Sequence, residues 1–136
     1  MRAKSLARAA CLGLLVSVAP ALAHHSFAAE YDTSKPIKVT GVVTKMEWMN
    51  PHARFYVDVK EADGTVSTWN FELGAIPVLL KQGWRKDALK PGDQVTVEGN
   101  RAKDESHTAA ARVVLLPDGR RVFGGSAADG SAPPNQ

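Results

Sequence analysis

The chain has 136 residues, enough for one domain with a modest hydrophobic core. It carries 17 lysines and arginines against 14 aspartates and glutamates, and three of the basic residues lie within the first eight positions. The remainder is therefore close to neutral, and a neutral domain lacks the electrostatic footprint of a nucleic-acid-binding protein. We expect no nucleic acid partner.

The first 23 residues have the pattern of a secretory signal peptide. A basic start precedes an apolar run over residues 9–18 and an A-x-A cleavage site at residues 21–23. The apolar run is too short to anchor the chain in a bilayer. We expect cleavage after Ala23, export to the periplasm and no membrane anchor in the mature form. Cys11, the single cysteine, lies in this leader, so the mature chain has no disulfide and no thiolate chemistry.

Two strands flank the break at Asn50-Pro51-His52. The first runs from residue 37 to about Trp48, and Gly41 within it permits a sharp bend. The second strand ends at Lys60 and alternates apolar with polar residues, which is typical of a strand with one buried face. The alternation places three apolar side chains on one face, namely Phe55, Val57 and Val59.

A third strand, over residues 68–73, follows an Asp63-Gly64 turn. A short helix is predicted over Ile76 to Gln82, because Pro77 is tolerated in its first turn and Gly83 can end it. We expect one end of the fold to be plugged by Leu79, Leu80 and Trp84. The later elements are a strand around residues 95–97, a charged loop over 99–106, a strand over 108–116 and a short strand at 121–123.

This order of elements predicts an all-β fold with one short helix. Three strands, a helix and further strands, with a long bent first strand, are typical of the OB-fold, a small barrel of five to six strands. The alternative is an incomplete β-sandwich. The expected organisation is an irregular N-terminal arm over residues 24–36, the barrel over 37–124 and a disordered tail over 125–136.

Several segments of the mature chain carry a resemblance to a known family. They are HHSFAAEYD, TGVVTKMEWMNPHARFYVDV, WNFELG and LKPGDQVTVEGNRAKD. Together they resemble a family of small exported bacterial proteins of unknown function whose mature chain opens with HHSF. The resemblance covers nearly the whole mature chain. It implies export and a small β-barrel domain, and it brings no assigned activity or catalytic residue.

Cleavage after Ala23 would make His24 the first residue of the mature protein. An N-terminal histidine offers its free amine and its own Nδ1 to one metal ion, and a second imidazole completes a three-nitrogen site called a histidine brace. Copper heads the affinity order for such nitrogen ligands. His25 is a further candidate, because a second-position histidine also chelates Cu(II). The alternative is that the two histidines are simply a soluble, cleavable start.

Two other histidines lie in predicted loops. His52 falls between the first two strands, and His107 ends the loop before the fifth strand. In OB-folds these two loops flank the same binding face, so we expect the two imidazoles to be neighbours and candidate metal ligands. The alternatives are that His52 belongs only to a turn and that His107 is an exposed strand start.

Met46, Trp48 and Met49 come just before His52. Thioethers are soft ligands that suit Cu(I), and an indole face attracts cations. The group is similar to the sites of periplasmic OB-fold copper metallochaperones, although the spacing differs and the resemblance is local. The alternative is that Met46 and Trp48 belong to the hydrophobic core.

We interpret the chain as a non-catalytic binding protein, with copper as its candidate cofactor and a metal ion or a periplasmic protein as its partner. No Ser-His-Asp order or phosphate loop is apparent, and Glu47 and Glu72 read as single surface acids. One alternative is a copper-dependent oxidase of histidine-brace type. Another is a metal-free OB-fold module that binds a peptide, a glycan or a partner protein, for which the polar faces of the second and third strands offer Arg54, Tyr56, Asn70 and Glu72.

Overall fold

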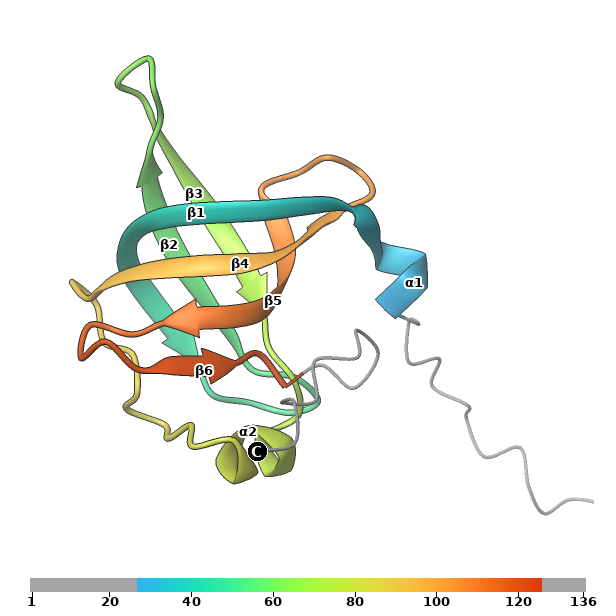
Figure 1. The fold of residues 1–136 in the computed structure, drawn as a ribbon, viewed down its shortest axis with the longest axis vertical. Coiled ribbons are helices and arrows are strands. Elements are labelled where there is room, and N and C mark those ends of the chain that lie inside the picture. The colour runs from blue at the N-terminus through green and yellow to red at the C-terminus, as the bar shows by residue number, and fades with distance from the viewer. Residues whose placement is uncertain (1–26, 126–136) are drawn as a thin grey trace, which may run out of the picture.

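The computed structural model describes residues 27–125 of the chain. The predicted leader, His24 and His25, and all but the first residue of the predicted tail lie outside this range. The described elements, labelled in Figure 1, are α1 (Phe27–Glu30), β1 (Tyr31–Glu47), β2 (Arg54–Lys60), β3 (Val66–Glu72), α2 (Ile76–Lys81), β4 (Gln94–Ala102), β5 (Thr108–Leu115) and β6 (Arg121–Phe123). Between residues 27 and 125, no helix has the length and apolar character needed to cross a membrane.

Five strands close into a ring (Figure 1). They are antiparallel in the order β3-β2-β1-β4-β5, and a parallel pairing of β3 with β5 completes the ring. β6 lies outside the ring and pairs with β5. A ring of five strands with the helix between β3 and β4 is the arrangement of an OB-fold. The predicted all-β, OB-fold-like barrel is therefore confirmed.

The long first strand pairs with two different strands along its length. β1 pairs with β4 up to Val42 and with β2 from Val42 onward, with a register shift between Val43 and Lys45. Figure 1 shows β1 curving strongly as it passes from one partner to the other. Gly41 lies at this change of partner, where a Cβ atom would come within 2.3 Å of the Asp58 carbonyl oxygen. The missing side chain thus permits the close approach of β2 to the bend.

The helix α2 covers one end of the barrel, as predicted (Figure 1). Leu79 and Trp84 are fully buried there, and the Trp84 indole N–H donates to the Phe123 carbonyl at 2.7 Å. The prediction that Leu80 also fills this end is wrong, because its side chain is 44% exposed. Consecutive helical residues point about 100° apart, so Leu80 turns away from the surface that Leu79 buries.

Two expected segments of irregular structure are strands instead. Residues 31–36, expected in the arm, form the start of β1, where Tyr31 pairs with Ala102 and Pro36 with Asn100. The charged loop expected from Gly99 begins only after Ala102, because β4 continues to that residue. The two segments are backbone partners of each other, so neither can be recognised as a strand from its own residues alone.

Candidate functional site

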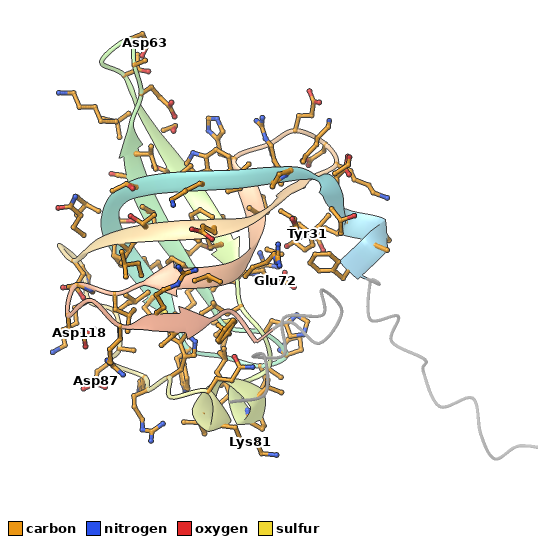
Figure 2. The ribbon with its side chains drawn as sticks, viewed as in Figure 1. Tyr31, Asp63, Glu72, Lys81, Asp87 and Asp118 are labelled. Carbon is orange, nitrogen blue, oxygen red and sulfur yellow. The ribbon has the colours of Figure 1, made fainter. Side chains whose placement is uncertain are left out.

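Four side chains meet on the outer face of the barrel around the carboxylate of Glu72. Tyr31 Oη donates to Glu72 Oε2 at 3.0 Å, and His52 Nδ1 lies 2.9 Å from Glu72 Oε1. Arg54 forms an ion pair with Glu72 Oε2. We call these four residues the Glu72 cluster. Figure 2 shows the Tyr31 and Glu72 side chains next to one another, beside α1.

The strands bring this cluster together from distant parts of the sequence. Arg54 and Glu72 are directly opposite each other on β2 and β3, where opposite charges attract. Tyr31 comes near Glu72 through two other strands. Tyr31 pairs with Ala102 of β4, and Glu72 pairs with Ala110 of β5. Tyr31, Ala102 and Ala110 pack together in a small hydrophobic cluster of their own. The closure of the ring therefore builds the site.

Contacts fasten α1 to the barrel beside the Glu72 cluster. The rings of Phe27 and Tyr31 pack with their centroids 5.2 Å apart. The backbone N–H of Lys103 donates to the Glu30 carbonyl at 2.9 Å, and Lys103 Nζ donates to the Ala28 carbonyl at 2.6 Å. The first described residues of the chain are thus held against the loop between β4 and β5.

The Tyr31 phenol is favoured in its neutral form. Burial raises the pKa of Tyr31 above its ordinary value, and the nearby carboxylates of Glu72 and Glu30 raise it further. The hydrogen bond that the phenol donates to Glu72 acts in the same direction, because it stabilises the protonated form.

This raised pKa predicts a loss of stability in alkali. Above about pH 10 the unfolded chain releases the phenolic proton and the native protein retains it, so the free energy of unfolding falls as pH rises. Below that pH the contribution of the neutral phenol is fully present. Urea unfolding between about pH 8 and pH 11 should show a steeper loss for the wild type than for Tyr31→Phe. Equal pH slopes for the wild type and Tyr31→Phe would contradict the prediction.

His52 presents one ring nitrogen that Glu72 does not engage. Its Nδ1 faces a carboxylate, which only accepts, so in the neutral ring Nδ1 carries the proton and Nε2 holds the lone pair. The side chain is 39% exposed, so the ring reaches solvent. A carboxylate on the second ring nitrogen is the usual arrangement of a metal-binding histidine, because it fixes the tautomer and the ring orientation.

His107 lies elsewhere on the barrel. Its ring stacks on Trp69 with centroids 4.9 Å apart, and the Arg101 guanidinium lies 5.6 Å from the centre of the same indole. Trp69 is a buried core residue, whereas Glu72, three positions further along β3, points to the opposite face. His52 and His107 therefore contact opposite faces of one strand, and the structure does not bring them together as expected.

The residues before His52 divide between core and surface. Met46 and Trp48 are partly buried and pack against the hydrophobic core, as the alternative interpretation held. Met49 is 51% exposed. Among residues 27–125, no group of three or more His, Cys, Asp or Glu side chains is placed to hold a metal ion. A metal site at His52 therefore needs a ligand of another kind or one from outside this range.

Sequence reasoning missed the position of Glu72 at the centre of a cluster. Glu47 and Glu72 were both predicted to be single surface charges, but both have partners. Glu47 accepts hydrogen bonds from Lys45 and, at 3.2 Å, from the Tyr56 hydroxyl. The hydrogen bond from Lys45 lowers the pKa of Glu47. Polar and apolar residues alternate along β2 and β3, so the register of this hairpin places Arg54 opposite Glu72. The hairpin register is the signal from which this ion pair could have been predicted.

A family model described as "Family of unknown function (DUF6152)" matches residues 12–111. The chain belongs to this family. The expected membership of a family of unknown function is thereby confirmed. No curated protein matches the chain. Two crystal forms of Rim1, a mitochondrial single-stranded DNA binding protein from S. cerevisiae, are similar over 60% of this chain and 92% and 91% of theirs, with 13% and 10% identity and TM-scores of 0.48 and 0.46.

Proposed function

We propose that this chain is an exported, non-catalytic protein that binds copper at the Glu72 cluster. In this proposal the leader is removed after Ala23, and His24 supplies its amine and its imidazole. His52 supplies the third nitrogen through Nε2. Three nitrogen donors with no carboxylate in the set suit Cu(II), which heads the affinity order for such sites.

The observation that carries the proposal is the hydrogen bond between His52 Nδ1 and Glu72 Oε1. It turns a half-exposed surface histidine into an oriented ligand whose free nitrogen is Nε2. Glu72 is itself held by Tyr31 and Arg54, so the carboxylate supports His52 and both of its oxygens are engaged. It is thus suited to orient the ligand and not to act as a ligand.

The position of α1 supports a contribution from the N-terminal histidine. His24 lies three residues before Phe27, so their Cα atoms are at most about 11 Å apart. Phe27 packs on Tyr31, whose hydroxyl bonds the same carboxylate that holds His52. Phe27 therefore lies on the side of the barrel that carries His52, which supports a contribution from a donor three residues before it. His25, one residue closer to Phe27, is the alternative donor.

The proposal is tested by Cu(II) titration of the exported protein and by electron paramagnetic resonance. N-terminal sequencing first establishes whether the product begins at His24. We expect His52→Ala to weaken Cu(II) binding at least about tenfold, because it removes one of three ligands. His107→Ala, which alters a ring stacked on Trp69, is the matched control and should bind as the wild type does.

A chemical modification tests the amine. Acetylation of the N-terminal amine of the mature protein should abolish the three-nitrogen spectrum, because an acetylated nitrogen no longer binds Cu(II). Equal copper affinity of the acetylated and native proteins would exclude the amine as a ligand. Equal Cu(II) affinity of His52→Ala and the wild type would show that the Glu72 cluster does not bind copper. Oxygen consumption by the copper-loaded protein with a reductant would replace a binding role with that of an oxidase.

A further inference from the structure

The connection between β1 and β2 carries a second donor that the proposed Cu(II) site does not use. Met49 is 51% exposed, in contrast to Met46 and Trp48, which pack against the core. A large apolar side chain half in water contributes little to the stability of the barrel. Its thioether sulfur is, however, a soft metal ligand in reach of solvent.

Met49 and His52 lie on either side of one bend. The backbone bends at Asn50 and Pro51, the two residues between them. Three residues span at most about 11 Å when extended, and a bend shortens that separation. His52 is held on its other side by Glu72, so its Nε2 is the nitrogen left for a shared ligand. Met49 is half exposed, so its flexible side chain can adopt another rotamer on the solvent side and turn toward the ring.

We propose that Met49 Sδ and His52 Nε2 together hold Cu(I). One thioether and one imidazole form a soft donor pair that suits the monovalent ion, whereas an amine and two imidazoles suit Cu(II). This inference rests on the proposed function, because His52 is the ligand that both oxidation states share. It makes the protein a carrier that accepts either ion, with Met49 taking part in the Cu(I) form alone.

The experiment is an anaerobic competition for Cu(I) between the protein and the chelator bicinchoninate. Met49→Leu keeps the size and apolar character of the side chain and removes the sulfur, so it should fold normally. We expect it to bind Cu(I) at least about tenfold more weakly than the wild type, with an unchanged Cu(II) spectrum. Met46→Leu is the matched control, and it should bind both ions as the wild type does.

The results separate this inference from the proposed function. Equal Cu(I) affinity of Met49→Leu and the wild type overturns the inference, and an intact Cu(II) spectrum in the same samples leaves the proposed function standing. If Met46→Leu weakens Cu(I) binding as much as Met49→Leu does, the effect is structural and the inference fails. If the wild type binds neither ion, both fail. A loss of Cu(I) binding in His52→Ala as well as in Met49→Leu supports the pair.

Discussion

Gly41→Ala is expected to destabilise the barrel by about 3 kcal/mol. A Cβ atom at this position would lie 2.3 Å from the Asp58 carbonyl oxygen and 2.7 Å from a methyl of Val57. Both neighbours belong to the central part of β2, and the Asp58 oxygen is backbone, so neither can move aside without disturbing the strand. The clash falls where β1 exchanges β4 for β2 as its partner, so relieving it would open the ring.

The measurement is urea unfolding followed by tryptophan fluorescence. Gly64→Ala is the control, because Gly64 has open space around it and its cost arises from a φ of +86° alone. That cost is about 1 kcal/mol, so Gly41→Ala should be clearly the less stable of the two. If both variants lose the same stability, the close packing between β1 and β2 is not the reason that position 41 requires glycine.

Those parts of the fold that depend on nearby residues were predictable. The alternation of Phe55, Val57 and Val59 marks a strand with one buried face, and all three side chains are buried. The helix after β3 was predicted from Pro77 and Gly83, and Gly83 has the positive φ of +93° that favours glycine at such an end. In each case the local pattern and the tertiary packing favour the same structure.

The end of β4 was not predictable, because its residues have the composition of a turn. Gly99 and Asn100 pair with Ala111 and Ala110 of β5, and a Cβ atom at Gly99 would lie 2.1 Å from the Ala110 carbonyl. The glycine is needed for close packing of two strands, not for a reversal of the chain. Only knowledge of which strand lies opposite distinguishes these two uses of glycine.

The place of Tyr31 in the Glu72 cluster was unpredictable for a similar reason. Tyr31 and Glu72 are 41 positions apart in the sequence, and the parallel pairing of β3 with β5 is what brings their surroundings together. Knowledge of the fold alone also predicts the wrong neighbour for His107, because two loops at one binding face need not direct their side chains to one point. Residue 107 instead contacts Trp69, which faces the core, whereas His52 contacts Glu72 on the outer surface.

The other large effect is expected at the end of the barrel that α2 covers, where Trp84→Ala should cost about 3 to 5 kcal/mol. Trp84 is fully buried, its ring packs 6.4 Å from that of Phe55, and its N–H satisfies the Phe123 carbonyl. The substitution leaves both a cavity and an unpaired carbonyl. The expected loss is a large share of the roughly 5 to 15 kcal/mol by which a folded domain is stable. Thermal unfolding followed by circular dichroism measures the loss without relying on the removed fluorophore. Trp48→Ala is the matched control, and because Trp48 is only partly buried it should cost markedly less; equal losses would show that α2 and Trp84 do not close the core.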